Sequence, residues 1–160
     1  MNIFITGNGQ GDYYKVNDVR HGTVRKVWYD SPTLGTTRRM TIYTPPGYEE
    51  DKKTRYPVFY LLHGAGGDEE AWMDLGRTSQ IMDNLIAQGK AEPMIVVMTN
   101  GNAGEISAPG QGPDGFKAPG FRQRGMMDGA FEMSFCDVIN YVERNFRVYK
   151  DKKHRAIAGL

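Results

Sequence analysis

The chain has 160 residues, and its 20 basic and 19 acidic side chains leave a formal net charge of +1. This length suits one ordinary domain, and the balanced charge, without a long run of either sign, disfavours nucleic acid or an anionic membrane as partner. Hydrophobic residues make up 39%, which is too apolar for disorder. No apolar run approaches the roughly 20 residues that span a bilayer, so we expect a globular domain outside the membrane.

Signals for export, disulfides and metals are missing from the sequence. Residues 1–11 lack the basic start and apolar stretch of a signal peptide, so none is expected. The single Cys136 excludes an internal disulfide and zinc sites built from Cys pairs. His21, His63 and His154 are dispersed, without the spacing of metal ligands on a helix, so we expect neither a metal nor another cofactor.

The first 44 residues predict a polar segment followed by a β-hairpin. Residues 1–22 are rich in glycine and polar side chains, and we predict a loop or the tail of a preceding domain. Apolar and polar residues alternate along residues 23–29 and 38–44, which predicts two antiparallel strands. The segment 31–35, with its proline and glycine, supplies the turn between them.

The next segments alternate between strand and helix patterns. Residues 57–62 are continuously apolar and short, which predicts a strand buried on both faces. Residues 79–89 place apolar side chains at helical spacing and finish on a glycine, as a helix often does. The helical apolar residues are Ile81, Leu85 and Ile86. Residues 94–98 repeat the pattern of a buried strand.

The last third of the chain predicts a long loop, a helix and a final strand. Residues 101–130 hold too many glycines and prolines for regular structure, and a loop of this length is commonly functional. A single apolar stripe with a period near 3.6 predicts a helix over residues 131–146. A charged turn at 150–153 then leads into a strand that starts at His154. A β-α-β-α-β order after two antiparallel strands predicts an α/β fold with a mostly parallel sheet.

A glycine-rich loop follows the first apolar strand and carries the first chemical signal. Its residues are His63, Gly64, Ala65, Gly66 and Gly67. A dinucleotide fingerprint would need glycine where Glu69 stands, and the chain has no G-K-[ST] triplet of a P-loop. Two interpretations remain open, a tight strand-to-helix turn or an oxyanion hole. In an oxyanion hole the Ala65 N–H would stabilise a carbonyl oxygen as it becomes negative.

A second motif begins at the last residues. The run 154–158 predicts a strand, and Gly159 and Leu160 open a turn of the kind that starts a G-x-S-x-G nucleophile elbow. The next residue of such an elbow would be the serine. In proteins with this elbow the catalytic histidine follows the serine in chain order, so we predict that His63 orders the glycine loop rather than acting as a base.

These segments together resemble a known family. The matching blocks are Arg39–Tyr48, Tyr56–Gly67 with Trp72, Val97–Asn102, Tyr141–Glu143 with Phe146–Val148, and His154–Leu160. They resemble the feruloyl and acetyl-xylan esterases of carbohydrate esterase family one, whose wider kin include esterase D-type and mycolyltransferase-type enzymes. The resemblance runs from about Gly22 to the end of the chain, and several blocks in one order are more specific than any single motif.

The resemblance implies an α/β-hydrolase fold with N-terminal antiparallel strands, of which residues 23–160 would form the N-terminal half. It implies a catalytic serine immediately after Leu160, with the acid and histidine further along, so that no triad residue lies in this chain. Ala65 would supply one oxyanion N–H, and the residue after the serine the other. Without the triad, the 160 residues alone would be inactive.

The same resemblance implies a function, the hydrolysis of plant cell-wall esters, feruloyl esters above all, through an acyl-enzyme. The expected pocket residues are Trp72, Asn100, Phe121, Met126 and Met127. The substrate would be a small-molecule or polysaccharide-linked ester, and a secreted or periplasmic location would fit. Residues 1–22 would be the tail of an immunoglobulin-like domain of the carbohydrate-binding type.

Other functions remain open at this point. A noncatalytic fragment or a degenerate glycan-binding protein would fit a chain without a triad. An acetyl-xylan esterase would act on the same polymer, and a formylglutathione-type enzyme would hydrolyse thioesters instead. In each case the last strand is expected to form an exposed apolar edge of the sheet, which predicts a tendency to aggregate.

Overall fold

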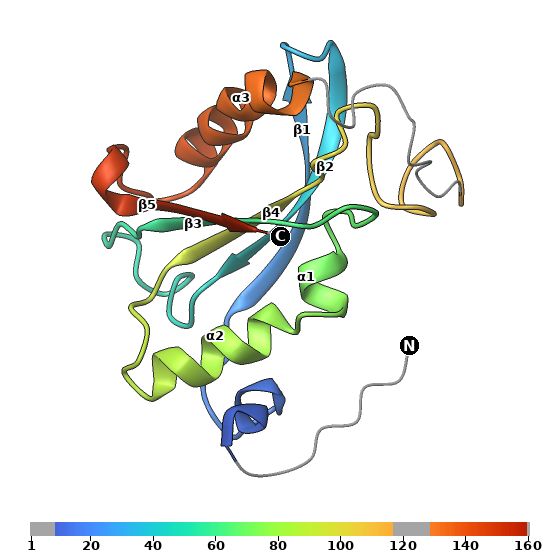
Figure 1. Ribbon diagram of the computed structural model, residues 1–160. Coiled ribbons are helices and arrows are strands. Elements are labelled where there is room, and N and C mark those ends of the chain that lie inside the picture. Colours follow the sequence, from blue (N-terminus) through green and yellow to red (C-terminus); the bar gives the residue numbers. More distant parts are fainter. Residues whose placement is uncertain (1–8, 117–128, 160) are drawn as a thin grey trace.

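A computed structural model describes residues 9–116 and 129–159 of the chain. Its centre is a five-stranded sheet in the order β1-β2-β4-β3-β5 (Figure 1). The strands are β1 (Thr23–Ser31), β2 (Thr36–Thr44), β3 (Val58–Leu62), β4 (Ile95–Thr99) and β5 (Arg155–Gly159). β2 pairs antiparallel with β1 and β4, whereas β3 pairs parallel with β4 and β5. Among the described strands β2 alone runs against the others, which confirms the predicted mostly parallel sheet.

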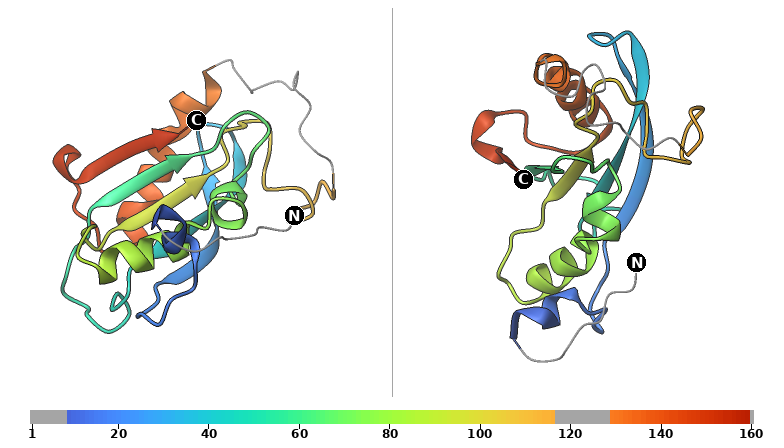
Figure 2. Two further views of the ribbon diagram at one scale, coloured as in Figure 1. Left: turned by 60° about the horizontal axis from the view of Figure 1, so that its bottom comes forward. Right: turned by 45° about the vertical axis from the view of Figure 1, so that its right-hand side comes forward.

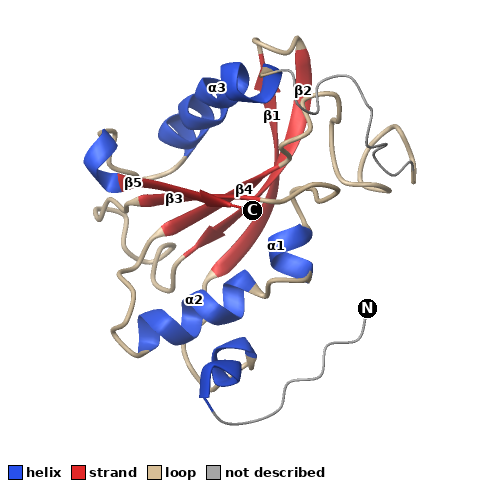
Figure 3. Ribbon diagram, viewed as in Figure 1, coloured by secondary structure: helices blue, strands red, loops and turns tan. Residues whose placement is uncertain are grey.

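Helices cover both faces of the sheet (Figures 2 and 3). The helices are α1 (Ala71–Asp74), α2 (Thr78–Ala87) and α3 (Ala130–Asn145), with 3-10 helices η1 (Gly9–Tyr14) and η2 (Lys152–His154). β4 and β5 flank β3 on opposite sides. Crossovers of one hand therefore place α1 and α2 on one face and α3 on the other. None of the described helices is both long and apolar enough to cross a bilayer.

The core consists of two apolar layers that meet at β4, whose residues are all buried. On one face Ile95 and Val97 pack against Val142 of α3. On the other face Val96 packs in a second cluster with Met82 of α2. The stripe predicted for residues 131–146 is confirmed as the buried face of α3, because an amphipathic helix turns its apolar side to the sheet.

The prediction that residues 57–62 are buried on both faces is wrong in part. Val58 and Tyr60 are buried, whereas the three other residues of β3 are only partly covered. The neighbour of β3 on that side is β5, the edge strand of the described sheet, where Ile157 is 60% exposed. The described sheet thus has the expected apolar edge, and the tendency to aggregate stays a prediction.

The buried side of α2 also differs from the prediction. Its buried residues are Thr78, Met82, Asp83 and Asn84, and the predicted Ile81, Leu85 and Ile86 are half-buried. The Asn84 amide donates hydrogen bonds to the backbone carbonyls of Tyr13 (2.8 Å) and Lys15 (2.9 Å). The N-terminal segment, predicted as a loop, therefore contains η1 and is held on α2 by polar contacts that no local pattern contains.

Asp83 extends this contact into the sheet. Its Oδ1 atom accepts hydrogen bonds from the Gly22 N–H (2.8 Å) and from the Tyr43 hydroxyl of β2 (2.7 Å). Burial and this hydrogen bond raise the pKa of Tyr43 above the usual range, so the hydroxyl stays a donor. Gly89, with φ of 66°, ends the region of α2 as predicted, because glycine adopts the left-handed conformation without strain.

Two methionine substitutions test this division between core and surface. Met40 in β2 is 0% exposed and Met133 in α3 is 67% exposed. We expect Met40→Ala to lower the free energy of unfolding by about 2–5 kcal/mol, because it leaves a cavity in the core. Met133→Ala should change it by less than about 0.5 kcal/mol. Urea unfolding followed by circular dichroism measures both, and equal losses would contradict the packing described above.

Candidate active site

The candidate site lies where β3 and β5 end side by side. Leu62 at the end of β3 is in register with Gly159 at the end of β5. A Cβ atom on Gly159 would lie 2.7 Å from the Leu62 carbonyl oxygen, so only glycine permits this approach. After β3 the chain adds β4 on one side of it and then β5 on the other, so the order of the strands reverses at β3. Ligands of open α/β sheets bind outside the carboxyl ends of strands at such a reversal.

The glycine loop after β3 closes in a tight turn. The Gly67 N–H donates to the Gly64 carbonyl at 3.0 Å, and Gly66 has a φ of 77°, in the left-handed region. A Cβ on Gly67 would lie 2.9 Å from the Cβ of His63. Two constraints therefore require glycine in this loop: the left-handed turn conformation at Gly66 and the close approach of the His63 side chain at Gly67.

His63 holds this loop to the segment after β4 through both of its ring nitrogens. Its Nε2 accepts a hydrogen bond from the Gly101 N–H at 2.7 Å. Its Nδ1 lies 2.7 Å from the Gly64 carbonyl oxygen, which can only accept. The two contacts together require a neutral ring with its proton on Nδ1. Neither nitrogen is left to take a proton from a nucleophile, which agrees with the predicted structural role.

The bond from His63 fixes the peptide group that joins Gly64 to Ala65. No described peptide bond is cis, and in a trans peptide the C=O and N–H point in opposite directions. Because the Gly64 carbonyl points to the His63 ring, the Ala65 N–H points away from it. Ala65 is exposed, and among the described residues no acceptor is hydrogen-bonded to its N–H. The loop therefore presents an unused, oriented donor.

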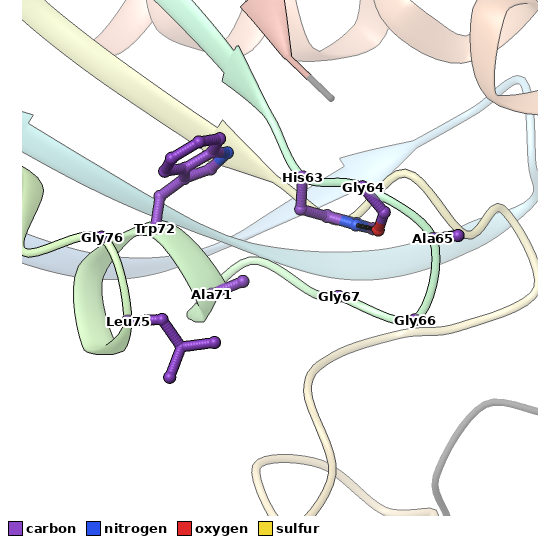
Figure 4. A pocket seen from close by; sticks show the side chains of 9 residues that line it. All are labelled: His63, Gly64, Ala65, Gly66, Gly67, Ala71, Trp72, Leu75 and Gly76. Atoms are coloured by element: carbon purple, nitrogen blue, oxygen red, sulfur yellow. Dashed lines mark hydrogen bonds between the residues drawn. The ribbon is translucent and has the colours of Figure 1, made fainter. Parts of the chain in front are cut away.

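A pocket of about 430 Å³ opens beside this donor (Figure 4). It is lined by the loop residues 63–67 together with Ala71, Trp72, Leu75 and Gly76. The Trp72 indole N–H donates to the Leu62 carbonyl at 2.9 Å, which ties α1 to the end of β3. Leu75 is 52% exposed, and its role could not be found from the sequence because no motif includes it. The pocket thus offers an apolar wall next to a hydrogen-bond donor.

A cluster of ion pairs involves the two glutamates that follow the glycine loop. The Arg39 guanidinium contacts the carboxylates of Glu69 (3.1 Å) and Glu70 (2.7 Å), and Lys26 contacts Glu70 at 2.8 Å. Glu69 also accepts from the Ala108 N–H at 2.7 Å. Burial raises the pKa of Glu69 above its usual value, against the opposing effect of these hydrogen bonds. No sequence motif contains this cluster, since Arg39 and Ala108 lie 30 and 39 positions from Glu69.

Arg38 binds the backbone of the segment after β4. Its guanidinium is fully buried and donates to the carbonyls of Asn100 (2.9 Å), Asn102 (2.7 Å) and Glu105 (3.0 Å). These carbonyls flank the Gly101 N–H that binds His63. Arg38 therefore fixes the backbone before and after Gly101, the residue whose N–H binds His63.

The structure does not bring all predicted site residues together. Asn100 is buried and does not line the pocket beside Ala65, and its amide donates to Glu69 (3.2 Å) and Glu105 (3.1 Å). Its place in the substrate pocket of the whole protein stays a prediction. Phe121, Met126, Met127 and Leu160 lie outside the described residues.

The other two histidines lie apart from the site. His21 contacts Asp83 and His154 contacts Asp151, at 2.9 and 2.8 Å. Within residues 9–116 and 129–159, no three His, Cys, Asp or Glu side chains gather in a way that could hold a metal ion.

Comparisons with known proteins agree with this geometry. The family model described as "Putative esterase" matches residues 31–160. The endo-1,4-beta-xylanase/feruloyl esterase of Xylanibacter ruminicola is 35% identical over 161 residues, which cover 99% of this chain and 21% of that protein. A solved ferulic acid esterase is 30% identical with a TM-score of 0.68, over 87% of this chain and 50% of its own.

A second solved structure, the ferulic acid esterase of the anaerobic fungus Anaeromyces mucronatus, has a TM-score of 0.68 at 24% identity. The match covers 99% of this chain and 57% of that one. These likenesses confirm the predicted α/β-hydrolase fold. The chain belongs to the esterase family. It spans 21% of the Xylanibacter relative and about half of the solved esterases, so it corresponds to part of each.

Replacing Glu69 with glutamine should change how stability depends on pH. Because burial raises the pKa of Glu69 above its unfolded value of about 4.3, the folded state binds the proton first as the pH falls. The stability of the wild type relative to Glu69→Gln should therefore rise as the pH falls from neutral through the folded pKa. It should level off below the unfolded pKa.

Urea unfolding of both proteins at a series of pH values measures this difference, because the glutamine variant cancels the titration of all other groups. A difference that shrinks toward acid pH would show instead that Arg39 and the Ala108 N–H keep the carboxylate ionised, and would contradict the expected direction.

Proposed function

We propose that this chain is the N-terminal part of a serine carboxylesterase that hydrolyses feruloyl esters of plant cell-wall polysaccharides. The nucleophile would be a serine directly after Leu160, and the acid and histidine would follow later in the protein. The likeness to the Xylanibacter xylanase/feruloyl esterase supports a feruloyl ester as the bond that is hydrolysed and xylan as the polymer that carries it. The apolar wall formed by Trp72 and Leu75 supports an aromatic or similarly apolar group beside the reacting carbonyl.

The observation that carries this proposal is the pairing of Leu62 with Gly159, because the loop that bears the Ala65 N–H starts directly after Leu62. A residue that continues β5 past Gly159 emerges next to the end of β3, because Gly159 and Leu62 are paired. A serine there would attack an ester carbonyl whose oxygen faces the Ala65 N–H. The triad histidine would take the serine proton and pass it to the leaving alcohol, and water would then hydrolyse the acyl-enzyme.

The role of the 160 residues themselves is to bind and stabilise. The Ala65 N–H would meet the oxygen as it becomes negative, and a donor held in place before the reaction loses no energy to reorganisation. Hydrogen bonding of the Gly64 carbonyl to His63 also polarises the shared peptide group, which strengthens its N–H as a donor. His63 is thus a positioning residue and acts through Ala65.

The test of function uses the full-length protein that contains this chain. We expect hydrolysis of methyl ferulate and one covalent adduct with a fluorophosphonate, and no adduct on the isolated 160 residues. Hydrolysis of S-formylglutathione with no action on feruloyl esters would select the thioester hydrolase instead. A full-length protein with no adduct and no ester hydrolysis would be noncatalytic and would overturn the proposal.

Two substitutions at Ala65 separate its N–H from its side chain. Ala65→Pro removes the N–H, so kcat for methyl ferulate should fall by about 10²–10³-fold, the usual effect of losing one oxyanion donor. Ala65→Gly keeps the N–H and should retain most of the activity. Circular dichroism checks that both variants are folded. Equal activity in the two variants would show that this N–H plays no part.

A double-mutant cycle tests whether His63 acts through Ala65. His63→Ala should lower kcat more than it changes KM, because the free peptide group no longer points its N–H at the oxyanion. In the Ala65→Pro background the same change should have little further effect on kcat, since the donor is already gone. Additive losses in the double variant would mean that His63 supports folding alone.

A further inference from the structure

A second pocket, of about 490 Å³, lies between the β1–β2 hairpin and α3. Figure 1 shows this region at the top of the molecule, where α3 lies beside the two long strands. Its lining includes Trp28, Asp30, Asp137, Asn140 and Arg144, and it shares no lining residue with the pocket beside Ala65. The function proposed above leaves this pocket unexplained.

Two carboxylates in the lining are held in place as acceptors. Asp137 accepts hydrogen bonds from the Ser31 hydroxyl (2.7 Å) and the Thr33 N–H (3.1 Å). Its partial burial alone would raise its pKa, but these bonds outweigh that effect and hold the pKa below the usual range. Asp30 accepts from the Thr37 hydroxyl at 2.8 Å. The pocket thus has fixed acceptors on both its strand and helix sides.

The donors of the pocket are unused among the described residues. Trp28 is 44% exposed, and neither its indole N–H nor the Asn140 amide has a hydrogen-bond partner in the described part of the chain. Arg144 is exposed and forms no ion pair with any described residue. A half-exposed indole with a free N–H offers an apolar face and a donor to the same ligand.

The mixture of groups limits the class of ligand. An anion would face two carboxylates, a cation would face Arg144, and a purely apolar ligand would leave these polar groups unsatisfied. A neutral sugar has hydroxyls that both donate and accept, and C–H faces that pack on an aromatic ring. We propose that the pocket bounded by Trp28, Asp137 and Arg144 binds a neutral saccharide.

This saccharide site has a role if the proposed esterase function holds. A polysaccharide that carries the ester would contact the protein at two places, and the second contact would raise the effective concentration of the ester at the first. Small esters cannot reach both pockets. Substitutions at Trp28 should therefore lower kcat/KM for feruloylated arabinoxylan and leave kcat/KM for methyl ferulate unchanged.

Hydrogen–deuterium exchange of the full-length protein with xylohexaose tests the site itself. We expect protection of the segments 26–37 and 137–145, which line the pocket, whatever other regions bind the sugar. Trp28→Ala should weaken this local protection, raising the apparent Kd about tenfold. Trp28→Phe keeps an aromatic face without the N–H and should have a smaller effect. Tyr14→Ala removes a similarly exposed aromatic side chain outside the pocket and should change nothing.

The outcomes separate this inference from the proposed function. Absence of protection in both segments, or protection that survives Trp28→Ala, overturns the saccharide site even if methyl ferulate is hydrolysed. Protection that Trp28→Ala removes, in a protein that hydrolyses no ester, keeps the saccharide site and overturns the esterase. Exchange of the variants without sugar shows whether either has lost its fold.

Discussion

The proposed ester site depends on the two hydrogen bonds of His63, which join the loops after two neighbouring parallel strands. The Nε2 atom of His63 accepts a hydrogen bond from the Gly101 N–H, and its Nδ1–H donates to the Gly64 carbonyl. Because a trans peptide is rigid, the second bond sets the direction of the Ala65 N–H without touching it. A catalytic donor on a glycine loop can therefore be as well oriented as a side chain on a helix, provided that the preceding carbonyl is held.

Buried charge beneath the loops supports this arrangement. Arg38 holds three backbone carbonyls of the segment after β4, and Arg39 holds two carboxylates at the start of α1. Taking such groups out of water is costly, and the cost is offset only when each is well paired. Removing one partner would leave the other unsatisfied, so the two loops are expected to keep one relative position. If the proposed function holds, the chain provides a rigid half of the ester site.

The sequence predicted the parts of this structure that depend on local pattern. Short apolar runs located the parallel strands, a 3.6-residue period located α3, and the order of motifs favoured a structural role for His63 over that of a base. The parts that were missed depend on contacts between distant residues. Asn84, which no sequence motif singled out, binds carbonyls 69 and 71 positions away. Asn100 donates to Glu69, 31 positions away, a contact that no motif indicated. No window of sequence contains such pairs.

The most direct test of the central claim is a crystal structure of the full-length protein after reaction with a phosphonate inhibitor. The phosphoryl oxygen of the adduct stands in for the oxyanion of the tetrahedral intermediate. We predict that it lies about 2.7–3.1 Å from the Ala65 nitrogen, with the phosphorus bonded to the serine after Leu160 and His63 still bound to Gly64 and Gly101. A phosphoryl oxygen turned away from Ala65, or an adduct on another residue, would contradict the account.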